Sequence, residues 1–486
     1  MDKAKIVKSL IYKFTERFAV KGIGFVISIL LARRIAPEVF GQVVILTVFA
    51  NLSMTLIEGG LNTALVQSRE VDDRDYSTVF YITLALAALV ILLMQPFAPL
   101  VAAFYKSPEM AVPLRVYAFS LLFGAFNSIQ VARLQREMRF RDMMLCSLTA
   151  TLVSGVLGVY LAYRGAGLWA LVVYYFAQVA VSCLAMLGVL RWLPGSRFSM
   201  ASAKRLYGFG IRILAASLIT NIYNDIRPLI IGRRFSTADL GYYNRGQTFS
   251  STVSLNLDAA VQSVMFPVLS RIQDDKDQLL ALFRRTKRMG AFLIFPVMLG
   301  MAAVSEPMVR LLLTDKWLPA VPFVVLLSVG EAQVPLTSTN LIAVKAMGRS
   351  DLYARQEVLR RVLMIAVLAV SVLCFRSVTA IAAGFVFSAW LDAFVTLLPI
   401  RKLLGYGFGD QLGDIWKSAL AALVMAAAVF AFGRLPLPLL PKLLLQTALG
   451  AAIYALMGFA LKNESLSYLL TALRNRRHPS GAGAEP

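Results

Sequence analysis

Charged side chains inside long apolar segments are the residues of this sequence that could do chemistry. Among the charged residues in or next to such segments, five basic and three acidic residues are the candidates for a site. An ionisable group in a membrane interior costs at least ~2.5–3.5 kcal/mol, so such groups normally face a water-filled interior and mark a substrate or ion pathway. The basic residues are Arg17, Lys21, Arg212, Arg227 and Arg245, and the acidic residues are Glu58, Asp225 and Asp258.

The basic residues predict a binding site for an anionic cargo. Arg and Lys donate charge-assisted hydrogen bonds, and the planar guanidinium of Arg can bind a phosphate or a diphosphate through two parallel bonds. Lys21 follows Arg17 by four residues, which places both side chains on one face of a helix. We therefore expect these cations to line a polar cavity that receives a phosphorylated molecule.

Most of these charges also have a structural explanation. Arginines near helix ends can extend their long side chains to the lipid headgroups. Three of them lie in such places: Arg17, Arg212 and Arg245. Lys21 lies deeper, and this explanation is harder to apply to it. Asp225 and Arg227 could form a structural pair near the outer face, whereas Glu331 and Asp392 are single polar residues of the kind that usually make helix-packing contacts.

The sequence lacks the motifs of common hydrolases and nucleotide-dependent enzymes. It contains no G-x-x-x-x-G-K-[ST], H-E-x-x-H or G-x-S-x-G motif. The single histidine, His478, lies in a polar tail, which leaves no histidine for acid–base or metal chemistry in the apolar segments. The three cysteines, Cys146, Cys183 and Cys374, form no C-x-x-C pair and are expected to be reduced packing residues. We therefore expect no enzymatic activity, no cofactor and no metal.

The composition predicts that membrane-spanning helices carry these residues. Hydrophobic residues make up 58% of the 486 and charged residues 16%, and the mean hydropathy is +0.69. Soluble domains hold about 45–50% apolar residues. Many apolar segments reach the roughly 17–25 residues that a spanning helix needs. The fourteen predicted spans cover residues 14–31, 43–57, 78–100, 113–131, 145–163, 168–190, 206–231, 247–269, 289–313, 319–344, 358–375, 378–400, 415–432 and 443–461.

The distribution of basic residues predicts that both termini lie in the cytoplasm of a bacterial cell. In a soluble protein the net charge of +22 would suggest a nucleic-acid partner. No basic domain exists here, however, so we expect none. When residues at helix ends are assigned to the adjoining loop, 32 of the 49 Lys and Arg fall on the cytoplasmic side and 12 on the periplasmic side. This asymmetry follows the positive-inside rule and favours an even number of helices in the inner membrane.

An internal repeat divides the predicted helices into two related halves. Residues 31–41 (LARRIAPEVFG) and 231–241 (IGRRFSTADLG) share the double Arg and the final Gly at an offset of 200 positions. Chance recurrence of this pattern at helix ends is the alternative. Six helices separate the copies, so both halves would insert in the same orientation. We predict an all-α polytopic membrane protein with two six-helix lobes, residues 1–200 and 201–405, followed by two helices and a cytoplasmic tail, residues 406–486.

Polar residues gather in corresponding helices of the two halves. Predicted spans 14–31 and 43–57 of the first half, and 206–231 and 247–269 of the second, are far more polar than the other ten. Transporters with parallel repeats bind their substrates between the repeats, near the bilayer midplane. We therefore expect these four helices to line a central cavity between the lobes.

Six short segments resemble those of the polysaccharide-transporter family. They are LARRIAPEVFG at 31–41, EGGLNTALVQ at 58–67, LGYYNR at 240–245, MFPVLSRIQDD at 265–275, DKWLP at 315–319 and AMGR at 346–349. The resemblance covers about residues 5–410. It is closest to the Wzx-like, colanic-acid-exporter type of lipopolysaccharide flippase, in the multidrug/oligosaccharidyl-lipid/polysaccharide exporter superfamily.

The resemblance implies a function, an energy source and partners. Such a flippase moves undecaprenyl-diphosphate-linked sugar repeat units to the periplasmic leaflet for exopolysaccharide, O-antigen or capsule synthesis. Two lobes would give alternating access, coupled to a proton or sodium gradient, with Glu58, Asp225 and Asp258 as candidates for the coupling. The family's cationic lumen would correspond to Arg17, Lys21 and Arg245. The implied partners are the lipid-linked oligosaccharide, membrane lipids, a polysaccharide polymerase and a chain-length regulator.

Two other functions are alternatives to a flippase. A multidrug or organic-cation antiporter of the same superfamily would need an acidic, aromatic-rich cavity. Here Arg or Lys accompanies every deep carboxylate except Glu331 and Asp392, which favours an anionic cargo. A membrane-bound polymerase or ligase would be expected to carry catalytic residues on a larger periplasmic loop, and the outward loops of this chain are short.

Overall fold

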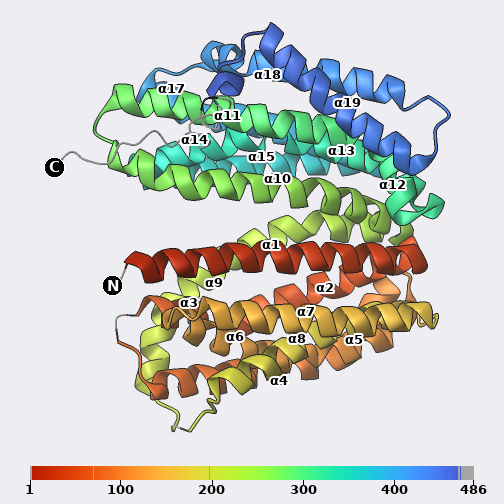
Figure 1. Cartoon of the computed structure of the whole chain (residues 1–486). Coiled ribbons are helices and arrows are strands. Elements are labelled where there is room, and N and C mark those ends of the chain that lie inside the picture. Colours follow the sequence, from red (N-terminus) through yellow and green to blue (C-terminus); the bar gives the residue numbers. More distant parts are fainter. Residues whose placement is uncertain (1–2, 69, 196, 469–470, 472–486) are drawn as a thin grey trace. The chain divides into compact units, whose positions relative to one another are not determined.

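Helices form every regular element in the described part of the chain (Figure 1). The computed structural model describes residues 3–68, 70–195, 197–468 and 471, and the side chains of the first helix from Ala19 onward. The elements are α1 (Lys3–Arg34), α2 (Pro37–Glu58), α3 (Leu61–Gln67), α4 (Asp73–Phe104), η1 (Pro108–Met110), α5 (Ala111–Ala118), α6 (Ser120–Arg136), α7 (Phe140–Tyr163), α8 (Leu168–Leu190), α9 (Met200–Arg234), α10 (Thr237–Arg271), α11 (Lys276–Ala303), α12 (Ser305–Leu313), η2 (Asp315–Ala320), α13 (Val321–Glu331), α14 (Val334–Ala346), α15 (Ser350–Cys374), α16 (Val378–Val395), α17 (Leu397–Leu404), α18 (Phe408–Phe432) and α19 (Leu439–Ala460).

The helices confirm a multi-pass membrane protein, with fewer clear spans than the fourteen predicted. Among the described residues, ten helical segments are long and apolar enough to cross a membrane. The number is eleven if α11 and α12, which are bent by 69° at their junction, form one broken span. The helices α1, α10 and α15 are 32, 35 and 25 residues long, but their polar and charged residues keep them out of this count. That these three cross the membrane stays a prediction.

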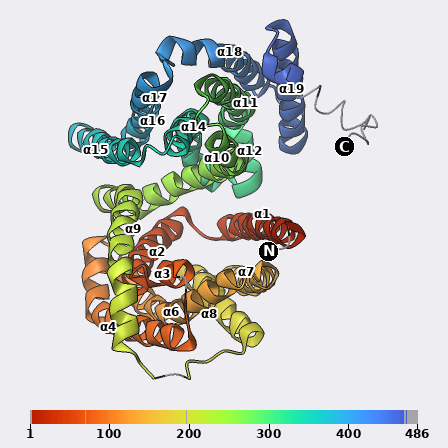
Figure 2. The same cartoon turned by 90° about the vertical axis from the view of Figure 1, so that its left-hand side faces the viewer.

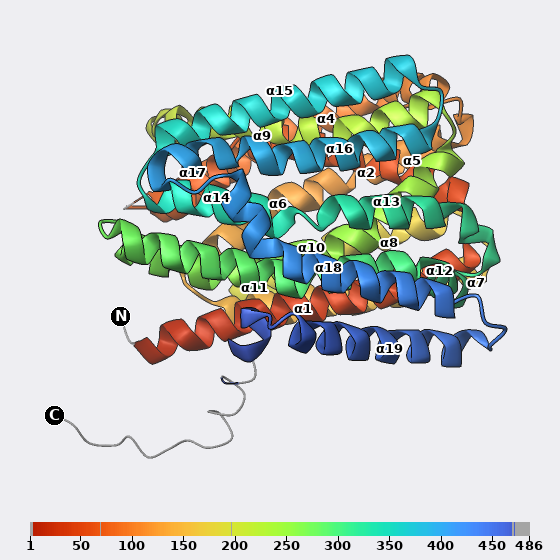
Figure 3. The same cartoon turned by 90° about the horizontal axis from the view of Figure 1, so that it is seen from above.

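The chain divides into two compact units, Met1–Gly241 (unit 1) and Tyr242–Pro486 (unit 2). In unit 1, α7 packs along α1 and α8, and α9 packs against α2, α3 and α4 (Figure 2). In unit 2, α18 packs between α11 and α19, and α15 packs along α16 (Figure 3). The lobe boundary at residues 200/201, which follows the sequence repeat, stays a prediction.

Both copies of the sequence repeat encode the same break between two helices. In the first copy α1 ends at Arg34 and α2 begins at Pro37. In the second copy α9 ends at Arg234 and α10 begins at Thr237, so the offset of 200 residues holds at both helix ends. Proline is favoured in the first turn of a helix, because its missing N–H would have no partner there.

The repeat also brings its two glycines close to backbone atoms of the other copy. A Cβ atom on Gly41 would lie 1.7 Å from the carbonyl oxygen of Thr237, and one on Gly241 would lie 2.0 Å from that of Pro37. Backbone atoms cannot move aside as the end of a flexible side chain can. Glycine therefore allows the first turns of α2 and α10 to approach each other.

Substituting Gly41→Ala is expected to destabilise the protein because the added methyl group must displace backbone. Overpacking of this kind costs about 1–3 kcal/mol. Thermal unfolding of the purified protein in detergent measures the effect. The matched control is Gly188→Ala in α8, where an added Cβ meets nothing within 4 Å. Equal unfolding midpoints for the two variants would contradict the prediction.

Candidate functional site

The predicted basic residues of unit 1 lie on α1 and α9. Lys21 is exposed on α1 and Arg212 is exposed on α9. Neither forms an ion pair with a carboxylate of the described residues. Arg227, further along α9, is half-buried. Arg17 lies on the first part of α1, and its side chain is outside the described residues.

Arg245 lies inside unit 2, where two of the segments that resemble polysaccharide transporters meet. Its side chain is only 5% exposed, and its guanidinium carbon lies 5.5 Å from the centre of the Trp317 ring. Trp317, in η2, is fully buried and also packs edge-on against Tyr242 at 6.0 Å. An aromatic face attracts a cation, so Trp317 helps to hold the Arg245 charge inside the unit.

The three predicted acidic residues lie in different surroundings. Glu58 is half-buried at the end of α2 and lines a cavity of about 510 Å³ among α2, α3, α6 and α8. Asp225 is half-buried on α9. Asp258, on α10, is 7% exposed and accepts hydrogen bonds from the Ser338 hydroxyl and the Gln262 amide. Of the eight predicted site residues, Glu58 alone lines the unit 1 cavity among the described side chains.

A smaller polar cavity lies within unit 2. It has a volume of about 300 Å³, and α10, α14, α15 and α16 contribute to its walls. Its polar lining includes Gln262, Thr337, Ser338, Arg360 and Asp392. Asp258 reaches this place through its hydrogen bonds to Ser338 and Gln262.

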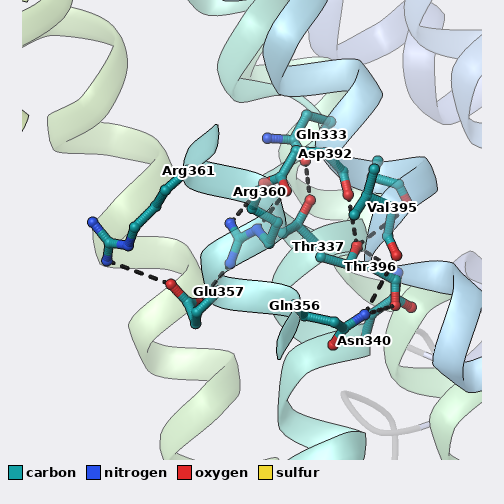
Figure 4. A network of polar contacts seen from close by, with 11 residues as sticks. Gln333, Thr337, Asn340, Gln356, Glu357, Arg360, Arg361, Asp392, Val395 and Thr396 are labelled. Atoms are coloured by element: carbon teal, nitrogen blue, oxygen red, sulfur yellow. Dashed lines mark hydrogen bonds and ion pairs between the residues drawn. The ribbon is translucent and has the colours of Figure 1, made fainter. Parts of the chain in front are cut away.

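An ion pair between Arg360 and Asp392 forms the centre of a polar network beside this cavity (Figure 4). Both oxygens of Asp392 accept hydrogen bonds from Arg360, and the Nη2–Oδ2 distance is 2.6 Å. Nη1 of Arg360 donates to Glu357 at 2.7 Å, and Arg361 pairs with the same carboxylate at 3.4 Å. Two cations thus balance two carboxylates, and the network adds no net charge to the cavity.

Asp392 and Glu331 are therefore not isolated, and both make contacts between helices. Asp392 joins α16 to α15 through Arg360, and Glu331 accepts a hydrogen bond of 2.6 Å from the Ser254 hydroxyl of α10. The positive-inside count assigns Arg360 to a cytoplasmic helix end, whereas the structure places it in the middle of α15. The predicted spans 358–375 and 378–400 contain both members of the pair, which is the sequence signal for it.

Unit 2 also contains a fully buried cation that the sequence pattern does not indicate. Lys287 of α11 is 0% exposed, and its ammonium group donates to Asn340 at 2.7 Å and to Gln411 at 2.8 Å. The rings of Phe283 and Tyr406 lie 4.6 and 4.8 Å from the same nitrogen. Two amide oxygens and two aromatic faces therefore replace the water around this charge.

This chain is similar to proteins that are named for polysaccharide biosynthesis. The succinoglycan biosynthesis transport protein ExoT of Rhizobium meliloti (strain 1021) is 25% identical over 95% of this chain and 94% of its own length. The lipopolysaccharide biosynthesis protein WzxC of Escherichia coli (strain K12) is 23% identical over 85% of this chain and 84% of its own length.

Solved structures share the fold. The lipid II flippase MurJ, in an inward closed conformation, has a TM-score of 0.74 at 14% identity and covers 94% of this chain and 98% of its own. An inward-facing multidrug resistance transporter of the MATE family, in the MOP superfamily, has a TM-score of 0.59 at 13% identity and covers 81% of this chain and 98% of its own.

The family match agrees with the resemblance that the six sequence segments predict. Residues 30–322, more than half of the chain, match the family described as "Polysaccharide biosynthesis protein". This stretch covers most of unit 1 and the first part of unit 2, and it includes both copies of the sequence repeat. The chain is a helical transmembrane transporter that belongs to the polysaccharide biosynthesis protein family.

Proposed function

We propose that this chain is a flippase of the bacterial inner membrane, with both termini in the cytoplasm. It moves undecaprenyl-diphosphate-linked oligosaccharide repeat units to the periplasmic leaflet for exopolysaccharide, O-antigen or capsule synthesis. The observation that carries the proposal is the pair of exposed cations, Lys21 and Arg212, which have no carboxylate partner among the described residues. A cation in a membrane-spanning helix is stabilised by an anion, and a diphosphate supplies one with several acceptor oxygens.

The depths of the two cations suit a cargo that moves inward from the membrane edge. Lys21 lies 13 residues before Arg34, and Arg212 lies 22 residues before Arg234, the equivalent helix end in the repeat. At a rise of 1.5 Å per residue these spacings are about 20 and 33 Å. In a hydrocarbon core of about 30 Å, Arg212 would meet the diphosphate near one edge and Lys21 would bind it nearer the middle.

Names of similar proteins support the same cargo class. ExoT is named as a transport protein of succinoglycan biosynthesis, and MurJ is named as a flippase of lipid II. A polysaccharide polymerase and a chain-length regulator would act on the cargo after translocation. A proton or sodium gradient would drive the cycle, with Glu58, Asp225 and Asp258 as the candidate coupling residues.

A multidrug antiporter is the second candidate function, because a MATE family transporter shares the fold. Such a protein would bind organic cations, and the exposed charges of Lys21 and Arg212 would repel them. The charge of the cargo therefore separates the two functions.

Deleting the gene in its native bacterium tests the proposal. We expect loss of surface polysaccharide and accumulation of undecaprenyl-diphosphate-linked repeat units whose sugars face the cytoplasm. Enzymatic labelling of right-side-out and inverted membrane vesicles measures that orientation, and a plasmid copy should restore export. Normal surface polysaccharide together with increased drug sensitivity would favour the antiporter instead.

A further inference from the structure

The cavity of unit 1 that Glu58 lines differs in charge from the positions of the exposed cations Lys21 and Arg212. It measures about 510 Å³, within the ~300–1,000 Å³ range of small-molecule pockets. No Lys or Arg is among the described residues that line it. Its polar lining is made of amides, hydroxyls and one carboxylate: Glu58, Asn62, Thr63, Gln67, Asn127, Ser128 and Gln135.

A glycine turn builds one wall of this cavity. Gly59 and Gly60 have φ angles of 56° and 72°, in the left-handed region that favours glycine. The turn ends α2 directly after Glu58 and starts α3, which carries Asn62. A Cβ atom on Gly60 would lie 2.3 Å from the carbonyl oxygen of Gly210, so the turn packs closely on α9.

One face of α6 builds the opposite wall. Gly124, Asn127, Val131 and Gln135 all line the cavity, and their spacing of three, four and four residues puts them on one helix face. The amides of Asn127 and Gln135 lie on this face, and Gly124, one turn before Asn127, adds no side chain to it. A side chain at position 124 would meet Met54 of α2.

The amides of the cavity have hydrogen-bonding capacity left for a ligand. The Oδ1 atom of Asn62 is buried and accepts no hydrogen bond from the described residues. The Oδ1 atom of Asn127 accepts a long bond of 3.3 Å from the Ser182 hydroxyl. Each amide offers two donors and an acceptor, and a buried polar atom without a partner is unfavourable.

We propose that this cavity binds an uncharged sugar residue of the lipid-linked repeat unit, an inference that rests on the proposed function. Sugar hydroxyl groups both donate and accept hydrogen bonds, as the amides require, and Glu58 accepts from two of them. A uronic acid would place its carboxylate beside Glu58 with no basic residue in the described lining. The cavity therefore selects a neutral sugar over an acidic one.

The sugar and the diphosphate are then recognised by separate groups. Lys21 and Arg212 do not line the cavity, so their contribution to binding can be measured apart from that of the amides. The affinity for undecaprenyl diphosphate alone reports on the cations. The additional affinity for the complete lipid-linked repeat unit reports on the cavity.

Binding of two probes to the full-length protein in lipid nanodiscs tests the proposal. The probes are undecaprenyl diphosphate and the undecaprenyl-diphosphate-linked repeat unit extracted from the deletion strain. We expect the wild type to bind the second probe more tightly. Asn127→Leu and Gln135→Leu should each weaken binding of the lipid-linked repeat unit about 5- to 10-fold. Both variants should leave the affinity for undecaprenyl diphosphate unchanged.

The matched control is Gln278→Leu, which removes an exposed amide of α11 in unit 2. It should leave both affinities unchanged. The proposal is overturned if both cavity variants keep the full difference, if the wild type binds the two probes equally, or if the exported repeat unit contains no uncharged sugar. Failure to bind either probe would instead overturn the proposed function.

Discussion

Charge reversal at Lys21 and Arg212 is expected to reduce polysaccharide export at least tenfold without removing the protein from the membrane. Both side chains are exposed, so a carboxylate fits in either place. The reversal replaces an attraction for the diphosphate with a repulsion. Hydrogen bonds to charged groups contribute about 1.5–3 kcal/mol, which corresponds to roughly 10- to 100-fold in affinity.

Complementation of the deletion strain measures this effect. Cell-surface sugar is quantified for Lys21→Glu, Arg212→Glu and the double variant, and immunoblots of membranes give the protein amount. Lys21→Arg and Arg212→Lys should retain export because they keep the charge. Arg376→Glu is the matched control, since it reverses an exposed charge in the connection between α15 and α16. Wild-type export by the double variant would contradict the prediction.

The sequence predicts the helical segments well because apolar length and charge placement are local signals. Each copy of the repeat ends one helix and begins the next at equivalent residues, as the matching segments 31–41 and 231–241 indicate. The short helix α3 is not among the predicted elements, because it lies in a segment whose pattern is typical of a loop between two spans. Its position depends on the glycine turn and on packing against α9.

Contacts between helices could not be predicted from the sequence. Arg360 and Asp392 are 32 residues apart, and Lys287 binds amides that are 53 and 124 residues away. Such pairs depend on which helix faces meet, and a single sequence does not determine that. Glu58 is a predicted site residue, but the amides beside it are not, since isolated Asn and Gln in helices usually make packing contacts.

Removing the Asp414 carboxylate is expected to lower the stability of the protein more than Gly41→Ala or Asp410→Ala. Asp414 lies on α18 with a side chain only 2% exposed. Its oxygens accept hydrogen bonds from Nε and Nη2 of Arg284 at 3.0 and 2.9 Å, and from Nε of Arg288 at 2.8 Å. The Tyr406 hydroxyl donates a further bond at 2.9 Å. Burial, followed by the neighbouring Asp414 charge, raises the pKa of Tyr406, so its hydroxyl stays protonated and donates.

The expected cost of Asp414→Ala follows from the charges that it leaves behind. Arg284 and Arg288 are 35% and 29% exposed and can regain water, but Lys287 is fully buried and loses a nearby opposite charge. Breaking a buried ion pair by removing one partner costs about 3–5 kcal/mol. For a unit of this size that corresponds to a fall of the order of 10 °C in the unfolding midpoint.

Thermal unfolding followed by fluorescence-detected size-exclusion chromatography measures this loss. The control is Asp410→Ala on the same helix, which removes an exposed carboxylate that caps the Gly407 N–H and should cost about 1 kcal/mol. The double variant Asp414→Leu/Lys287→Met removes both buried charges and should recover part of the stability, because no buried cation then lacks a nearby opposite charge. If Asp414→Ala is no less stable than Asp410→Ala, the prediction is wrong and α11 and α18 stay packed without this carboxylate.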